Sequence, residues 1–254
     1  MSIESPMLSA FVARMATPEI TLASWGSLVY PISLAIEGPI IMLLTASTAL
    51  TENRKAYNKL FKYMVIMSIV FSLIHFLLAF TPLFYFLADG LMNVPDELLE
   101  PGRIGLQIMT PWTIMIAWRR LNQGVMIKYG NSKSVAIGTV IRLVALVFVL
   151  SYGKWFTSLS GIIVGSSAVA IAVTVEALYA HSAVQKILNH KLPASSDHAE
   201  ITRQNFTKFY LPLAITPLAT LLIHPIGAAG MSRMPEALSS LASWPVVYLS
   251  LIHI

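Results

Sequence analysis

Four ionisable residues lie inside long apolar stretches of the sequence: Glu37, His75, Arg142 and Glu176. An ionisable side chain at membrane depth is costly, and it usually faces a cavity or an oppositely charged partner. Arg142 can pair with either Glu37 or Glu176, and the other carboxylate is then left without a partner. A desolvated carboxylate of that kind can bind and release a proton or a sodium ion. These residues therefore indicate ion-coupled transport chemistry.

Glu37 is the residue that we expect to bind the ion, because Gly38 and Pro39 follow it directly. A proline inside a helix removes one amide hydrogen bond and frees the carbonyl four residues earlier, and oxygen ligands suit a hard cation. Under the alternative interpretation, Arg142 and one glutamate form a structural ion pair and the other glutamate is protonated or extends toward the membrane surface. For His75, an interhelical hydrogen bond is favoured over a proton relay, so His75 is a secondary candidate for the ion- or substrate-binding site.

Neither a metal site nor a cofactor other than the coupling ion is expected. The chain has no cysteine, which excludes disulfides and thiolate chemistry. His181, His190 and His198 have a spacing that fits no zinc motif, so we interpret them as surface residues. The sequence also lacks a phosphate-binding glycine loop, and direct coupling to ATP hydrolysis therefore has no site in it.

The composition places these residues in an integral membrane protein. Of the 254 residues, 56% are hydrophobic and only 11% are charged, which is far from the soluble average. The net charge of +5 does not indicate a nucleic-acid partner, because the 17 Lys and Arg residues are spread between long apolar runs as membrane flanks are. The expected partners are the lipid bilayer and a small-molecule or lipid-linked substrate.

Six apolar runs are long enough to cross a bilayer, which needs roughly 20 residues per helix. The predicted spans are residues 22–50, 60–88, 104–121, 134–152, 159–183 and 209–229, and an incomplete seventh begins near Leu241. Because lipid offers no partner for backbone amides, these runs must be helices. The predicted fold class is all-α: a polytopic transmembrane helix bundle with six complete helices and a truncated seventh.

The loops between these spans differ in charge. One set contains twelve basic residues: Arg54, Lys55, Lys59, Lys62, Arg119, Arg120, Lys128, Lys133, Lys186, Lys191, Arg203 and Lys208. The other set contains four: Arg14, Arg103, Lys154 and Arg233. The positive-inside rule predicts that the first set is cytoplasmic. The expected location is a bacterial-type inner or plasma membrane.

An internal repeat appears when the chain is aligned with itself at an offset of 219 residues. Eight of twenty positions from Pro6 to Trp25 are then identical, where ordinary composition would give roughly one or two. Six crossings separate the copies, so the repeats are predicted to be parallel, as in two-lobe transporters. Residues 1–184 are expected to form helices two to six of a first lobe, residues 185–208 a cytoplasmic linker, and residues 209–254 the start of a truncated second lobe.

The rest of that second lobe is an expected partner from the same polypeptide, and the chain is interpreted as a fragment. About twenty residues are expected to be missing before Met1. The last residues, 249–254, resemble the translation of a sequencing adaptor, so His253 is given no functional interpretation.

Three stretches resemble one known superfamily. They are residues 37–50, the pair Arg119-Arg120 followed by Gly124 and Tyr129-Gly130, and the stretch from Gly138 to Arg142. The chain resembles the multidrug, oligosaccharidyl-lipid and polysaccharide exporter superfamily, whose members are two six-helix bundles arranged as a V around a cavity. Within it, the order of Leu22-Ala23-Ser24, Tyr30, His75, Tyr85, Asp96-Glu97 and Arg103 is most similar to the progressive ankylosis protein branch. That resemblance implies export of small organic or pyrophosphate-like anions.

The expected function is a secondary active exporter or flippase, a MATE-like antiporter that works by alternating access and is not an enzyme. Coupling would use a proton or sodium ion, and the substrate would be an organic or lipid-linked anion or a drug. One alternative is a transport-inactive membrane scaffold or assembly protein. Another is an intramembrane lipid-modifying enzyme in which Glu37 and His75 act as acid and base.

Overall fold

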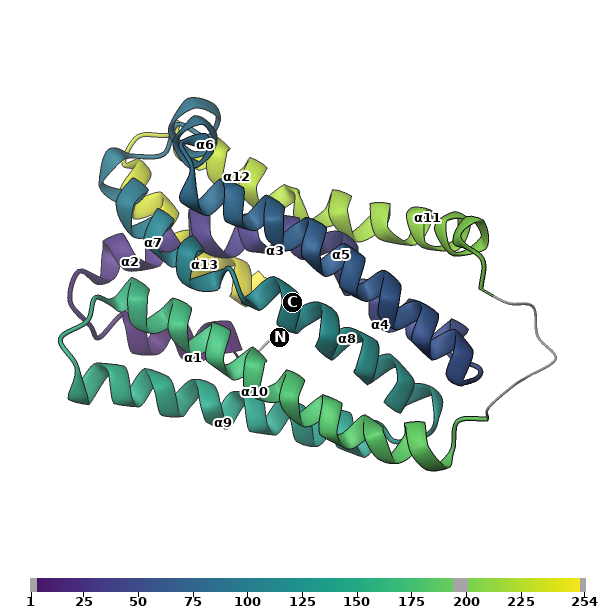
Figure 1. The fold of residues 1–254 in the computed structure, drawn as a ribbon. Helices are drawn as coiled ribbons and strands as arrows, with labels where there is room; N and C mark the ends of the chain where they lie inside the picture. Colours follow the sequence, from purple (N-terminus) through teal and green to yellow (C-terminus); the bar gives the residue numbers. More distant parts are fainter. Residues whose placement is uncertain (1–3, 194–200, 252–254) are drawn as a thin grey trace.

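The computed structural model describes residues 4–193 and 201–251. These residues form helices and contain no strand, which confirms the predicted all-α class (Figure 1). Five helical segments are long and apolar enough to cross a membrane: Pro18–Leu50, Arg54–Phe80, Ser132–Phe156, Gly161–His190 and Arg203–Met231. The middle of the expected linker (residues 194–200, with His198) and the C-terminal residues 252–254 (with His253) lie outside the described part of the chain.

The first membrane segment is irregular, and its prolines account for part of the irregularity. It consists of α2 (Pro18–Ser24), the π-helical turn η1 (Trp25–Val29), α3 (Tyr30–Ile41) and α4 (Leu43–Leu50). Directly before Pro31, the amide of Tyr30 donates to the carbonyl of Trp25. Since a proline has no amide to continue the helical ladder, a π turn is a natural adjustment at this position. Pro39 lies inside α3, and the break between α3 and α4 follows at Met42.

The second predicted span, residues 60–88, is wrong at both ends. Helix α5 (Arg54–Phe80) begins earlier, where the side chain of Asn53 accepts a hydrogen bond from the amide of Ala56. It ends at Thr81, whose backbone is extended because the residue before a proline, here Pro82, is disfavoured in the helical region. The short α6 (Leu83–Tyr85) and the π-helical η2 (Phe86–Leu91) follow.

The third predicted span, residues 104–121, is divided into two helices. After the short η3 (Asp96–Leu98), helix α7 (Leu99–Met109) ends before Thr110-Pro111, and α8 (Trp112–Lys128) begins after it. Because α8 continues to Lys128, Arg119 and Arg120 lie inside a helix. Their assignment to a basic loop was therefore wrong. The remaining helices are α9 (Ser132–Phe156), α10 (Gly161–His190), α11 (Arg203–Leu221), α12 (Ile223–Met231) and α13 (Ala237–Leu251).

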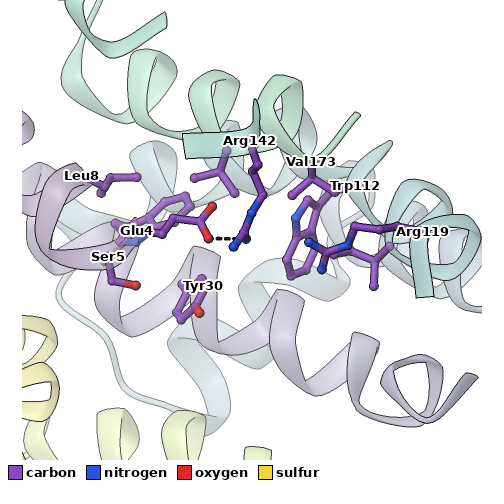
Figure 2. A pocket seen from close by; sticks show the side chains of 11 residues that line it. Glu4, Ser5, Leu8, Tyr30, Trp112, Arg119, Arg142 and Val173 are labelled. Atoms are coloured by element: carbon purple, nitrogen blue, oxygen red, sulfur yellow. Dashed lines mark hydrogen bonds and ion pairs between the residues drawn. The ribbon is translucent and has the colours of Figure 1, made fainter. Parts of the chain in front are cut away.

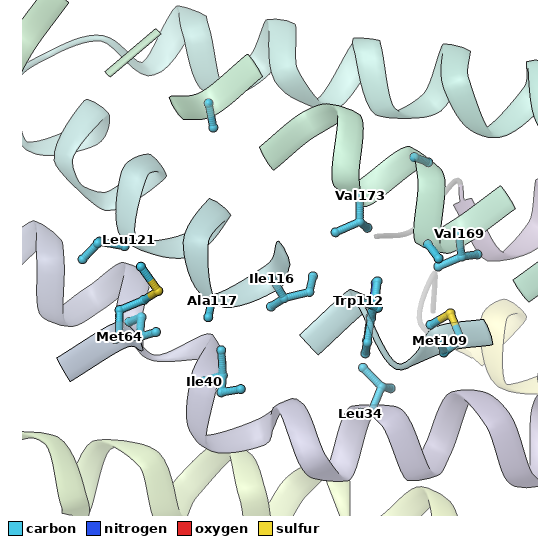
Figure 3. Close-up of a cluster of buried hydrophobic side chains, with 14 of the residues drawn as sticks. Leu34, Ile40, Met64, Met109, Trp112, Ile116, Ala117, Leu121, Val169 and Val173 are labelled. Atoms are coloured by element: carbon cyan, nitrogen blue, oxygen red, sulfur yellow. The ribbon is translucent and has the colours of Figure 1, made fainter. Parts of the chain in front are cut away.

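Helices α8 and α10 form the centre of the bundle. Helix α8 packs against α3, α4, α5 and α10, and α10 packs against α7, α8 and α9. Figure 3 shows Trp112, Ile116 and Leu121 of α8 in the hydrophobic cluster that joins these helices. In contrast, α5 and α9 expose apolar side chains such as Leu73 and Phe148 on their outer faces. Those outer faces have the character of lipid-facing surface.

Helices α4 and α8 cross closely at Gly124. A Cβ atom added at Gly124 would lie 1.8 Å from Ser47 Oγ and 2.3 Å from the carbonyl oxygen of Leu44. Ser47 Oγ donates to the carbonyl of Leu121 at 2.9 Å, and Thr48 Oγ1 donates to the carbonyl of Gly124 at 3.2 Å. Small residues and hydroxyl groups of this kind allow two helix backbones to approach each other in a membrane.

The internal repeat is also present in the backbone. Helix α1 (Glu4–Val12) and α12 have bounds that differ by the same 219 residues, as do the first residues of α2 and α13. The residues before α2 and α13, Thr17 and Glu236, both have left-handed backbones, with φ of 48° and 56°. Arg14 and Arg233 each donate to the carbonyl four residues earlier at 2.5 Å. The two copies therefore share one local structure, and α2 of the first packs against α13 of the second.

Candidate functional site

A buried ion cluster joins α8, α9 and α10. The carboxylate of Glu176 on α10 forms an ion pair with Arg119 on α8 and accepts a hydrogen bond from Gln123 Nε2 at 3.0 Å. The Nε atom of Arg142 on α9 lies 3.1 Å from Glu176 Oε2. Of the two partners open to Arg142 in the sequence, the structure therefore selects Glu176. Two hydrogen-bond donors, Arg119 and Gln123, and the nearby charge of Arg142 surround this carboxylate, and such a network allows a charge to be tolerated at membrane depth.

Gly138 explains why α9 and α10 come close enough for this cluster. It precedes Arg142 by one helical turn, so both residues lie on the same face of α9. A Cβ atom at Gly138 would lie 3.3 Å from the ring of Tyr179 and 3.5 Å from Glu176 Cγ. The glycine therefore leaves room for α10 beside the guanidinium group.

Arg142 has a second carboxylate partner, Glu4 on α1. The two residues line a pocket between α1, α3, α8, α9 and α10, together with Tyr30, Trp112 and Arg119 (Figure 2). Sequence reasoning missed Glu4, because residues 1–6 were treated as the remainder of a truncated segment. It also missed Arg119 and Gln123. The available signal was the apolar run at 114–118 before Arg119 and the second apolar run at 125–127, both inside the helix that continues to Lys128.

Glu37 lies apart from this cluster, on α3. Its side chain is fully buried, and neither carboxylate oxygen has a hydrogen-bond partner among the described residues. Arg120 and Arg119, both on α8, attract this carboxylate electrostatically. The Nε atom of Arg120 is also buried without a hydrogen-bond partner in the described chain. Glu37 is thus a buried acid near cations but without a direct contact to any of them.

The segment after Glu37 contacts α11. A Cβ atom at Gly38 would lie 3.1 Å from Leu218 Cα, so α3 and α11 approach closely at this glycine. The hydroxyl of Tyr210 donates to the carbonyl of Pro39 at 2.5 Å. This bond joins α11 to α3 just before the break at Met42. Glu37 is therefore next to the contact between α3 and α11.

His75 on α5 has a partner on each ring nitrogen. Nδ1 lies 3.0 Å from Thr113 Oγ1, and Nε2 lies 3.1 Å from the carbonyl oxygen of Leu106. A carbonyl can only accept, so Nε2 is the protonated nitrogen and Nδ1 accepts from the threonine hydroxyl. These contacts tie α5 to both helices beside the Thr110-Pro111 break. They agree with the interpretation of His75 as an interhelical hydrogen-bonding residue.

Within residues 4–193 and 201–251, no group of three or more His, Cys, Asp or Glu side chains is arranged to hold a metal ion. A second pocket lies between α3, α5, η2, α11 and α12, and apolar side chains such as Ile36, Phe71 and Leu218 line it. The described sites are therefore of two kinds: buried charges on α3, α8, α9 and α10, and an apolar pocket beside α11.

These features define an integral membrane helix bundle with charges enclosed at membrane depth. No family model matches the chain, and no curated protein matches it. A solved structure with the same fold is the inward-facing conformation of a multidrug resistance MATE family transporter of the MOP superfamily, with a TM-score of 0.76 at 12% identity. The match covers 99% of this chain and 59% of that transporter. The chain therefore has the fold of that transporter structure over nearly its whole length, which confirms the predicted transmembrane helix bundle.

Proposed function

We propose that this chain is part of a secondary active transporter, an exporter or flippase that works by alternating access and is coupled to a proton or sodium ion at Glu37. The observation that supports this proposal most directly is the fully buried carboxylate of Glu37 without a hydrogen-bond partner among the described residues. A buried carboxylate in this condition is stabilised when it takes up a cation, because its negative charge is then neutralised.

The position of Glu37 supports a link between ion binding and movement of the lobes. Glu176 and Glu4 already have Arg119 and Arg142 as partners, whereas Glu37 has none in direct contact. Glu37 also precedes Gly38 and Pro39, which contact α11, the first helix of the proposed second lobe. A change in the charge of Glu37 would therefore act on a contact between the two lobes.

The proposed substrate class is an organic or lipid-linked anion or a drug. The structural neighbour is described as a multidrug resistance transporter, and the similarity to the progressive ankylosis protein branch favours small organic or pyrophosphate-like anions. We propose a bacterial-type inner or plasma membrane as the location.

The test is the substitution Glu37→Gln in the whole transporter, assayed in inverted membrane vesicles. Citrate, pyrophosphate and ethidium serve as probes for an organic anion, a phosphate anion and a drug, each with and without a pH or sodium gradient. Glutamine keeps the shape of glutamate but has no charge to titrate. For whichever probe the wild type moves, gradient-driven transport by Glu37→Gln should fall at least about tenfold, while the amount of inserted protein is unchanged.

The matched control is Glu97→Gln, which removes the same charge from an exposed residue of η3. It should transport as the wild type does. If Glu37→Gln keeps the full dependence on the ion gradient, Glu37 is a structural residue and the coupling proposal is wrong. If the wild type moves none of the three probes under any gradient, the result favours the scaffold alternative.

The proposed orientation places the basic end of the bundle in the cytoplasm. The start of α5, the turn between α8 and α9, the end of α10 and the start of α11 lie together at the right of Figure 1. The variants Lys55→Cys and Ser196→Cys should react with an impermeant maleimide only from the cytoplasmic side, and Glu97→Cys only from the outside. Labelling is specific because the chain has no native cysteine. Reversed accessibility at all three positions would refute this orientation.

A further inference from the structure

The two carboxylates that contact Arg142 are held very differently. Glu176 lies in the bundle core, is 1% exposed, and has Arg119, Gln123 and Arg142 around it. Glu4 on α1 is 13% exposed, and Arg142 is its ion-pair partner. Figure 2 shows its carboxylate entering the pocket from the side of α1 and meeting Arg142 inside. Glu4 is therefore the more exposed of the two carboxylates, and it has fewer polar partners than Glu176.

The same pocket contains hydrogen-bond donors that have no acceptor. Trp112 is 3% exposed, and its Nε1 atom is buried without a hydrogen-bond partner in the described chain. The Nε atom of Arg119 is in the same condition. Both residues line the pocket, and in Figure 2 Trp112 lies between Arg119 and Arg142. A buried donor without an acceptor is uncommon in a folded protein, and a water molecule or an anion in the pocket would satisfy it.

We propose that this pocket is a binding site for a carboxylate group of a small organic anion, which replaces the Glu4 carboxylate at Arg142. The inference rests on the proposed function, because it takes the bound anion to be a transported substrate. The guanidinium group of Arg142 offers the planar donor geometry that a carboxylate fits, and the indole of Trp112 offers one further donor.

The charge balance of the pocket supports an exchange of one carboxylate for another. Arg119 and Arg142 are balanced by Glu176 and Glu4, so the four groups together are neutral. If Glu4 left alone, an uncompensated positive charge would remain at membrane depth, which is strongly unfavourable. If a carboxylate enters as Glu4 leaves, the balance is kept. The site should therefore prefer a carboxylate to a phosphate, which carries more than one negative charge near neutral pH.

The alternative is that Glu4 simply holds α1 against α9. The two interpretations predict opposite signs for Glu4→Gln. If Glu4 is only a structural partner, its loss weakens the fold and creates no anion site. If Glu4 occupies a site for an external carboxylate, its loss removes an internal competitor and increases the affinity for that anion.

The experiment measures binding of benzoate, succinate and phosphate to the whole transporter, purified in detergent, by titration calorimetry at constant ionic strength. Glu4→Gln should bind benzoate at least about tenfold more tightly than the wild type does. The matched control is Glu19→Gln, which removes an exposed carboxylate of α2 and should bind benzoate as the wild type does. Arg142→Lys in the Glu4→Gln background should abolish the gain, because lysine cannot present the planar donor pair.

A second variant keeps the test valid if Glu4→Gln does not fold. Trp112→Phe leaves the Arg142–Glu4 pair in place and removes only the indole donor, so it should weaken benzoate binding about three- to tenfold, as expected for one hydrogen bond. Unchanged benzoate affinity in both Glu4→Gln and Trp112→Phe would overturn the proposal. Binding of phosphate without benzoate or succinate would also overturn it. Since the assay uses no ion gradient and leaves Glu37 intact, its failure is separate from a failure of ion coupling.

Discussion

Replacing Arg119 with methionine should reduce the free energy of unfolding by about 3–5 kcal/mol, the range seen when one partner of a buried ion pair is removed. Glu176 would keep Gln123 and Arg142, but Arg142 is shared with Glu4. The remaining groups would then carry one uncompensated negative charge inside the bundle. The apparent melting temperature, followed by fluorescence-detected size-exclusion chromatography, measures the loss.

The double variant Arg119→Met with Glu176→Met should recover most of that stability. It removes one charge of each sign and leaves Arg142 paired with Glu4. The control is Lys133→Met at the exposed start of α9, which should change stability by less than about 0.5 kcal/mol. If the effects of the two single substitutions simply add in the double variant, Arg119 and Glu176 are not energetically coupled and the description of the cluster is wrong.

Gly124→Ala should prevent α4 and α8 from packing, with a loss of at least about 3 kcal/mol or failure to fold. The added methyl group would overlap Ser47 Oγ and the backbone oxygen of Leu44. A side chain can rotate away from such an overlap, but the Leu44 carbonyl is part of helix α4 and can move only with it. The hydroxyl bonds from Ser47 and Thr48 to α8 would be lost as the helices separate.

The matched control is Gly230→Ala on α12, where a Cβ atom would meet nothing within 4 Å. It should be neutral or slightly stabilising, because alanine has the higher helix propensity. The yield of monodisperse protein in detergent distinguishes the two variants. Equal yields of Gly124→Ala and Gly230→Ala would contradict the close crossing of α4 and α8.

The sequence predicts how deep the buried charges lie along their helices, but it does not predict which charges pair with each other. Apolar residues on both sides fix how far Glu37, Arg142 and Glu176 lie from the ends of their helices, and all three are buried. Whether Arg142 meets Glu37 or Glu176 depends on how α9 is rotated against its neighbours, and a linear sequence does not contain that angle. Gly138 is the local signal for the face of α9 that meets α10, but its role is visible only once Tyr179 is in place.

The helix breaks could be predicted only in part. Pro82 and Pro111 end or divide helices, whereas Pro212 and Pro217 lie inside the continuous helix α11. The same residue type therefore gives different results, because the packing around it decides whether the freed carbonyl finds another partner. The position of Arg119 was missed for a related reason. Arginine is typical of loop residues at a membrane surface, and only its contact with Glu176 on another helix reveals that it is buried.

The packing of α2 against α13 brings together two segments that the repeat relates, so each residue pair across it has a counterpart at the offset of 219 residues. Ser239 Oγ lies 2.9 Å from Glu19 Oε1. The offset of the repeat relates these residues to Ile20 and Leu238, which both pack against one hydrophobic cluster. In a homodimer of identical halves the two pairs would have to be alike. Here one pair is polar and the related pair is apolar, so the two sides of this contact are not interchangeable.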